Sequence, residues 1–110
     1  MHFLYEASYT SDSWATQVKS QPSVTERVKG MLDQLGGRIE SIYYAFGDYD
    51  VVAVLELPNQ EAAAAFALAV AAGGSVRSAK TTVLMTVDEG RAAMRRASDV
   101  GKVYQPAISR

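Results

Sequence analysis

The chain opens on alternating apolar and polar positions. The apolar side of this segment carries Phe3, Tyr5, Ala7 and Tyr9, and the other side carries Leu4, Glu6 and Ser8. A period of two is typical of a β-strand with one buried face. We therefore predict a strand over residues 3–9.

Two helical patterns follow this strand. Trp14 and Val18, four residues apart, indicate a short helical segment that stops at Gln21-Pro22. Ser23 and Glu26 have the spacing of a capping box at the start of a longer helix. Its apolar stripe consists of Val24, Val28, Met31, Leu32 and Leu35. Gly36-Gly37 would end the helix with a left-handed backbone.

The middle of the chain favours an antiparallel hairpin and a third helix. Residues 38–46 are rich in Ile, Tyr and Phe and residues 51–57 in Val and Leu, so both segments suit strands. The short segment 47–50 would join them as a hairpin. Asn59 is a candidate N-cap for an alanine-rich helix over residues 60–72, which Gly73-Gly74 would close.

The last third of the chain predicts a fourth strand and a further helix. Residues 76–86 have a strand-like order of Thr, Val, Leu and Met. Thr86 and Glu89 repeat the capping-box spacing, and we expect a helix over residues 87–97 with Met94 and Ala97 on its inner side. Residues 98–110 have no clear period.

This order of elements predicts an α+β fold. Two split β-α-β units with right-handed crossovers give a ferredoxin-like βαββαβ sandwich, here with an extra C-terminal helix. We expect one domain over residues 1–98 and a tail over residues 99–110. Two helices cover only one face of such a sheet. The other face would expose Tyr, Val, Met and Phe side chains, so we expect the chain to form a homodimer or higher homo-oligomer through it.

Composition removes several kinds of chemistry. The chain has 110 residues, 11 Lys and Arg against 12 Asp and Glu, one histidine and no cysteine. Disulfides, thiolate metal sites and a cysteine nucleophile are thereby excluded. The longest apolar run, residues 62–72, falls short of the roughly 20 residues of a membrane span. The N-terminus has no signal-peptide pattern, and we expect a cytoplasmic protein that binds no membrane.

The hairpin segment Gly47-Asp48-Tyr49-Asp50 has two interpretations. In the structural one, Gly47 supplies an unusual backbone angle, Asp50 accepts hydrogen bonds from backbone N–H groups, and Tyr49 packs on the sheet edge. We favour this interpretation because every part of the motif has a use in a turn. In the functional one, Asp48, Tyr49 and Asp50 lie at the mouth of a cavity and bind or deprotonate a small polar ligand.

Tyr43 and Glu56 are predicted to point away from the helices, together with Glu6. A carboxylate in an apolar cavity would have a raised pKa and could act as a general base. The alternative, which we favour, is that Glu56 lies in solvent or pairs with Arg77 or Lys80.

The remaining charged residues indicate no metal or cofactor. His2 follows the initiator methionine, where a solvated side chain is the simpler expectation. The segment 40–61 contains acidic residues and no basic one, whereas Arg91, Arg95 and Arg96 lie on the last helix. This asymmetry could steer an anion or nucleic acid. Because the isoelectric point is about 5.7, we instead favour a solvated helix face or pairing between chains.

The hairpin residues also carry a resemblance to a known family. Tyr43-Tyr44-Ala45-Phe46, the following Gly47-Asp48-Tyr49-Asp50, the strand Asp50 to Glu56 and the later Val76-Arg77-Ser78 resemble the GYD-domain family, a small bacterial family named for a Gly-x-Tyr-Asp motif. The resemblance covers about residues 3–97. It implies a subunit of the dimeric α/β-barrel type, in which two sheets pack face to face, and implies no particular reaction.

These observations support three hypotheses of function. The first is a small homo-oligomeric protein that binds a small ligand in a cavity on the open sheet face. Its candidate ligand-binding residues are Tyr43, Asp48, Tyr49, Asp50, Glu56 and Arg77. The second is a cofactor-independent enzyme, monooxygenase- or isomerase-like, in which Tyr43, Glu56 or Asp50 supplies acid–base chemistry. The third is a purely structural oligomer subunit.

Overall fold

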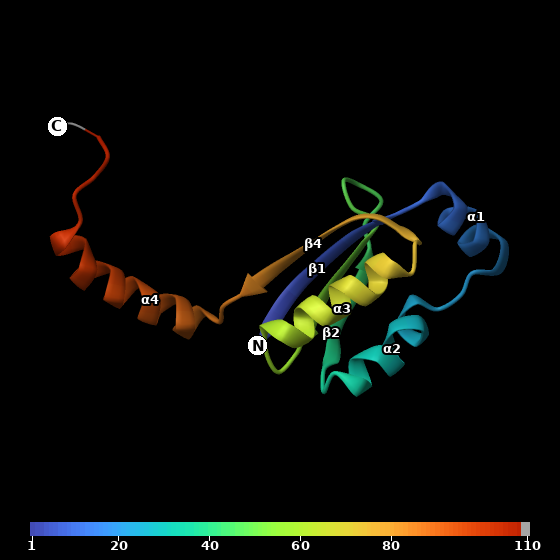
Figure 1. Ribbon diagram of the computed structural model, residues 1–110, viewed down its shortest axis with the longest axis horizontal. Coiled ribbons are helices and arrows are strands. Elements are labelled where there is room, and N and C mark those ends of the chain that lie inside the picture. Colours follow the sequence, from blue (N-terminus) through green and yellow to red (C-terminus); the bar gives the residue numbers. More distant parts are fainter. Residues whose placement is uncertain (109–110) are drawn as a thin grey trace.

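One antiparallel sheet of four strands, in the order β2-β3-β1-β4, organises the chain (Figure 1). The structure is a computed structural model, and it describes residues 1–108. Its elements are β1 (His2–Tyr9), α1 (Ser11–Ser20), α2 (Val24–Gln34), β2 (Arg38–Tyr44), β3 (Val51–Glu56), α3 (Gln60–Ala72), β4 (Val76–Leu84), α4 (Val87–Val100) and a 3₁₀ turn, Gly101–Val103. The predicted ferredoxin-like order with an extra C-terminal helix is confirmed.

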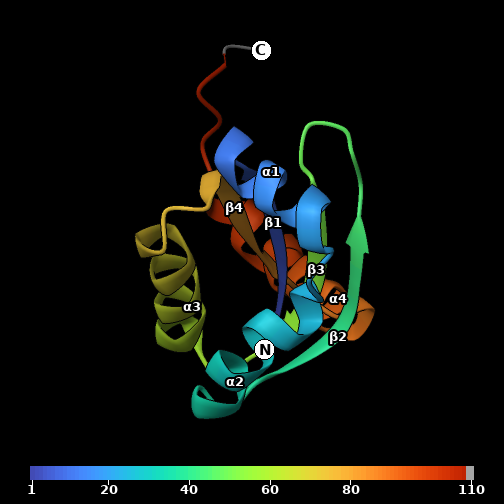
Figure 2. The same cartoon turned by 90° about the vertical axis from the view of Figure 1, so that its right-hand side faces the viewer.

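Helices α2 and α3 lie on the same side of the sheet (Figure 2). The buried side chains of this layer are Phe3, Tyr5, Ala7 and Tyr9 from β1, Val51, Ala53 and Leu55 from β3, Leu32 from α2, and Ala62, Ala63 and Phe66 from α3. Phe66 meets the ring of Tyr5 edge-on, with centroids 5.1 Å apart. The alternation along the strands therefore selects the buried face, as the sequence predicted.

Side-chain caps define where the helices begin. Glu26 N–H donates to Ser23 Oγ at 3.2 Å at the start of α2, which is one half of the capping box expected there. At α4 both halves are present, because Thr86 and Glu89 bond each other reciprocally. Asn59 caps α3 as predicted. Gly36 and Gly74 have φ values of +73° and +80°, so the two glycine pairs end their helices in the left-handed region.

No helix covers the other face of the sheet within the described part of the chain, and we call this face the open face. Pleating and the strand register place on it Leu4 and Glu6 of β1, Val52, Val54 and Glu56 of β3, Tyr43 of β2, and Lys80, Thr82 and Leu84 of β4. The expected Met and Phe side chains are not among them. Phe3 and Phe66 are buried on the helix side, and Phe46 stacks on Tyr44 with centroids 5.8 Å apart. The open face thus carries the predicted Tyr, Val and Glu side chains together with Leu, but neither Met nor Phe.

Helix α4 does not fold back onto the sheet, and it gives the molecule its length of 59 Å (Figure 1). None of its residues is buried. Met94 is 70% exposed, so the expectation that Met94 and Ala97 face inward is wrong for a single chain. Periodicity identified an apolar side of this helix, but it could not show that the side has no partner in the same subunit.

No helix among residues 1–108 combines the length and the apolar character needed to cross a membrane.

Candidate functional site

A cavity of about 190 Å³ lies between the sheet and the two helices. Its walls are mainly apolar and include Ala53 and Leu55 of β3, Val28 and Met31 of α2, Ile39 and Ile42 of β2, and Phe66, Ala69 and Val70 of α3. An apolar cavity of about 150 Å³ is large enough to hold benzene. This space can therefore take a small organic molecule.

Polar side chains also line the cavity. They are Tyr5 and Tyr9 of β1, Arg27 of α2 and Ser75, which precedes β4. Arg27 Nη2 donates to Tyr9 Oη at 3.1 Å, and the guanidinium carbon lies 5.8 Å from the centre of the Tyr9 ring. Arg27 is exposed to solvent, so it lies at the rim and retains donors that can meet an anionic or polar group.

Burial of the two phenols keeps them protonated. Desolvation is the main cause that raises the pKa of Tyr5, and the nearby Tyr9 raises it further. Desolvation also raises the pKa of Tyr9, although the charge and hydrogen bond of Arg27 oppose it. The Tyr5 hydroxyl is buried without a hydrogen-bond partner among the residues described. At neutral pH both phenols are hydrogen-bond donors rather than bases.

The predicted hairpin residue Asp50 has a structural role. Its Oδ2 accepts hydrogen bonds from Tyr9 N–H at 2.9 Å and from the Trp14 indole Nε1 at 3.2 Å. The backbone N–H of Asp50 donates to Ala7 C=O at 2.9 Å. This carboxylate therefore joins the β2–β3 connection to β1 and α1.

The other residues of the hairpin lie near the same end of the sheet. The backbone carbonyl of Asp48 accepts from the buried Ser8 Oγ at 3.0 Å, while Tyr49 is half-buried. The expectation for Gly47 is wrong: Phe46 has the positive φ, at 55°, and Gly47 does not. The residue with the left-handed backbone in this turn is therefore Phe46, one position before the glycine.

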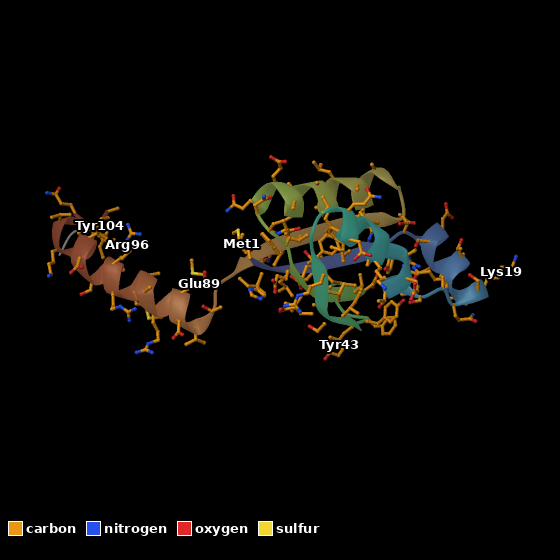
Figure 3. All side chains as sticks on the ribbon, turned by 90° about the horizontal axis from the view of Figure 1, so that it is seen from below. Met1, Lys19, Tyr43, Glu89, Arg96 and Tyr104 are labelled. Carbon is orange, nitrogen blue, oxygen red and sulfur yellow. The ribbon has the colours of Figure 1, made fainter. Side chains whose placement is uncertain are left out.

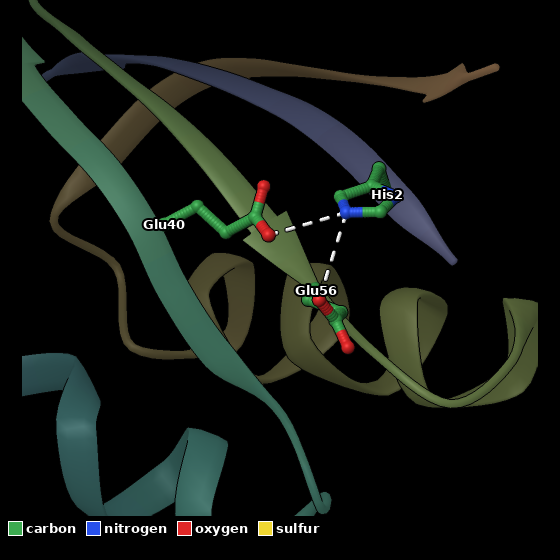
Figure 4. Close-up of side chains that lie close together, drawn as sticks. All are labelled: His2, Glu40 and Glu56. Carbon is green, nitrogen blue, oxygen red and sulfur yellow. Dashed lines mark hydrogen bonds and ion pairs between the residues drawn. The ribbon is translucent and has the colours of Figure 1, made fainter. Parts of the chain in front are cut away.

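At the opposite end of the open face, four polar side chains form a cluster that we call the His2 cluster. Arg38 Nη2 lies 2.7 Å from Glu56 Oε2 and 3.3 Å from Glu40 Oε1. His2 Nε2 lies 3.2 Å from Glu40 Oε1 and 3.5 Å from Glu56 Oε2 (Figure 4). Glu56 pairs with Arg38 and His2 rather than with Arg77 or Lys80, the partners that the sequence suggested.

The charge of Arg38 decides the protonation of Glu56. The hydrogen bond and the charge of Arg38 lower the pKa of Glu56 below the ordinary glutamate value. The raised pKa expected for a general base is therefore wrong for this residue. The reason is that the open face supplies a cation next to Glu56, which sequence spacing alone did not reveal.

The His2 cluster also contains the side chains that could hold a divalent cation. Ligand atoms of His2, Glu40 and Glu56 lie within 4.8 Å of one another. Arg38 already neutralises both carboxylates. A cation would have to displace the guanidinium before it could bind here.

The structure separates the ligand-binding residues that the sequence predicted. Tyr43 pairs with Val52 and Glu56 pairs with Arg38 in the β2–β3 ladder, so Tyr43 and Glu56 are four strand positions apart, about 13 Å. Asp50 lies near Trp14 on the helix side of the sheet. Arg77 is exposed and lies at the irregularity where β4 meets the end of β1.

None of the six predicted residues lines the helix-side cavity. Sequence reasoning missed Tyr5, Tyr9 and Arg27. The available signal was the placement of two tyrosines on the buried face of the first strand, where each hydroxyl needs a partner. In the alternating pattern both residues count only as apolar, which conceals their hydroxyl groups.

Comparison with known proteins agrees with the fold. The GYD domain family matches residues 3–94. No curated protein matches this chain. The family match covers most of the chain and includes every strand of the sheet, together with the hairpin motif that carried the resemblance. The chain belongs to the GYD domain family.

Proposed function

We propose that this protein binds a small, largely apolar molecule with one polar or anionic group in the cavity between the sheet and helices α2 and α3. The cavity carries the proposal, because it combines apolar walls with a few polar groups near one another, which is the usual composition of a small-molecule site. This places the ligand on the helix side of the sheet, not on the open face.

The polar side chains indicate the chemistry of the ligand. Arg27 offers a permanent positive charge at the rim, and Tyr9 offers a protonated phenol beside it. A carboxylate or a carbonyl oxygen would accept from these donors while the apolar part fills the space near Phe66 and Ala53. Protonated phenols favour binding over proton abstraction.

A thermal-shift experiment with defined probes tests this site. Benzoate and hexanoate should raise the unfolding midpoint of the purified protein by mass action. Benzylamine should not raise it, because it carries a positive charge like that of Arg27. Arg27→Gln should weaken the response to both carboxylates and leave the protein folded, since Arg27 is exposed.

A cavity-filling variant separates binding in the cavity from binding elsewhere. Ala53 is buried and lines the cavity, so Ala53→Leu should abolish the response to benzoate. Ala71→Leu adds the same atoms to an exposed position of α3 and should leave the response unchanged. An undiminished response in Ala53→Leu, or no response of the unchanged protein to any probe, would overturn the proposal.

We also propose that the working unit is a homodimer formed through the open face. Leu4, Val52 and Val54 are half-buried there although no part of residues 1–108 covers them, and a second copy would remove them from water. Light scattering at micromolar concentration should give twice the chain mass. Val54→Glu should yield monomers, with Lys19→Glu on α1 as a control. A monomer for the unchanged protein would refute the dimer.

A further inference from the structure

Helix α4 has one apolar side that nothing in its own chain covers. At 100° per residue, Val87, Met94 and Ala97 fall on one side of the helix, and we call this side the α4 stripe. Val87 is 80% and Met94 70% exposed. Figure 3 shows Glu89 and Arg96 on this helix, well away from the sheet. An amphipathic helix with an uncovered apolar side needs a partner to bury it.

The connection to β4 directs α4 away from its own sheet. Met85 and Thr86 alone separate the two elements. Thr86 is held extended, with φ −64° and ψ 162°, by its reciprocal bonds with Glu89. The Thr86 N–H to Glu89 Oε1 distance is 2.9 Å, and that from the Glu89 N–H to Thr86 Oγ1 is 3.0 Å. A capped helix after so short a connection continues outward and does not fold back beside α3.

An apolar groove of matching character lies between α3 and the edge strand β4. It is lined by Ala64, Ala67 and Leu68 of α3 and by Thr81 and Val83 of β4, and we call it the α3–β4 groove. Leu68 is 69% and Val83 48% exposed. Small alanine side chains on one wall allow another helix to approach closely.

We propose that α4 of one copy docks in the α3–β4 groove of a second copy, and that the second copy returns the same contact. When two copies related by a two-fold axis make this contact reciprocally, both helices and both grooves are occupied, so the assembly is a dimer and does not grow further. Glu61 precedes Ala64 by about one turn of α3, and Arg91 borders the α4 stripe, so opposite charges flank the apolar contact. This contact goes beyond the ligand cavity and rests on the proposed homodimer, to which it adds a second interface.

Cysteine cross-linking tests the contact directly, because the chain has no cysteine of its own. Leu68→Cys and Met94→Cys are prepared as separate proteins, mixed and oxidised. We expect a disulfide-linked species that contains one of each. Ala92→Cys on the opposite side of α4 is the matched control and should not cross-link to Leu68→Cys, because a disulfide needs the two Cβ atoms about 4 Å apart.

The double variant Leu68→Cys with Met94→Cys distinguishes contacts between chains from contacts within one chain. A disulfide within one chain would show that α4 docks on its own groove, and this result would overturn the proposal. The proposal is equally refuted if the mixture of single variants gives no more cross-linked product than the Ala92→Cys control.

A charge placed on the α4 stripe tests the contact independently of the cross-link. Ala97→Glu should weaken the dimer by at least tenfold in light scattering, whereas Ala92→Glu on the polar side should not. If dimers persist in Ala97→Glu and no cross-link forms, the α4 contact is refuted while the open-face dimer stands. If the unchanged protein is monomeric and no cross-link forms, the open-face dimer and the α4 contact are both refuted.

Discussion

The Trp14 indole Nε1 donates a hydrogen bond to Asp50 Oδ2 at 3.2 Å, although 36 positions separate the two residues in the chain. The same oxygen accepts from Tyr9 N–H at 2.9 Å. The Trp14 ring also meets the Tyr9 ring edge-on, with centroids 5.2 Å apart. A residue of the hairpin motif thus holds three elements together, and its carboxylate is the shared acceptor.

Replacement of Asp50 by Ala should destabilise the protein by about 1–3 kcal/mol, because the Tyr9 N–H and the Trp14 indole lose their acceptor. Urea unfolding followed by tryptophan fluorescence measures the change. Asp48→Ala is the matched control: the bond at Asp48 uses its backbone carbonyl, so this change should cost less than about 0.5 kcal/mol. Equal losses in the two variants would contradict the assigned role of Asp50.

Replacement of Tyr5 by Phe should leave stability unchanged or raise it, by up to about 1 kcal/mol. The Tyr5 hydroxyl is buried without a partner in the described structure, and removal of an unsatisfied buried polar group relieves a desolvation cost. Tyr9→Phe is the comparison and should be destabilising, since it removes the hydroxyl that accepts from Arg27. Calorimetric unfolding of both variants checks the order, and a clear loss in Tyr5→Phe would show that its hydroxyl has a partner.

Gly37 should not tolerate a side chain. A Cβ at this position would lie 2.6 Å from the carbonyl oxygen of Glu56 and would collide with the side chain of Leu57. Gly37→Ala should therefore cost about 1–3 kcal/mol. Gly30→Ala within α2 meets no atom within 4 Å and should stabilise the helix by about 0.5–1 kcal/mol. Denaturant midpoints with opposite shifts in the two variants are the expected result.

The Arg38–Glu56 pair should make stability depend on pH on the acidic side. Arg38 lowers the pKa of Glu56 in the folded chain, so the folded chain binds this proton less readily than the unfolded chain. The contribution is fully present above the ordinary glutamate pKa of about 4.3 and is lost as the pH falls through the lower pKa of the folded state. An NMR titration of the Glu56 carboxyl carbon measures that pKa directly.

Arg38→Gln should raise the pKa of Glu56 toward its ordinary value and reduce this loss of stability in acid. Lys19→Gln, on the exposed helix α1, removes the same charge elsewhere and serves as the control. A Glu56 titration that is identical in Arg38→Gln and the unchanged protein would show that Arg38 does not set the pKa.

Much of the candidate site was beyond reach of the sequence because its residues come from separate elements. Tyr9 and Arg27 belong to β1 and α2, and their hydrogen bond spans 18 positions. The His2 cluster draws its members from β1, β2 and β3, and a residue beside the initiator methionine gave no sign of such partners. The hairpin motif is recognisable in the sequence, but the sequence could not assign the carboxylate of Asp50 to Trp14.

The sequence by itself determined the elements, their order, the caps and the buried face of each strand. These follow from period-two and period-3.6 patterns and from Ser, Thr, Asn and Gly at the helix ends, which act over a few residues. Tertiary structure decided the partners of Asp50 and Glu56, the cavity beside Tyr5 and the outward course of α4. These features depend on contacts between strands and helices that are far apart in the sequence, and local periodicity carries no information about such long-range contacts.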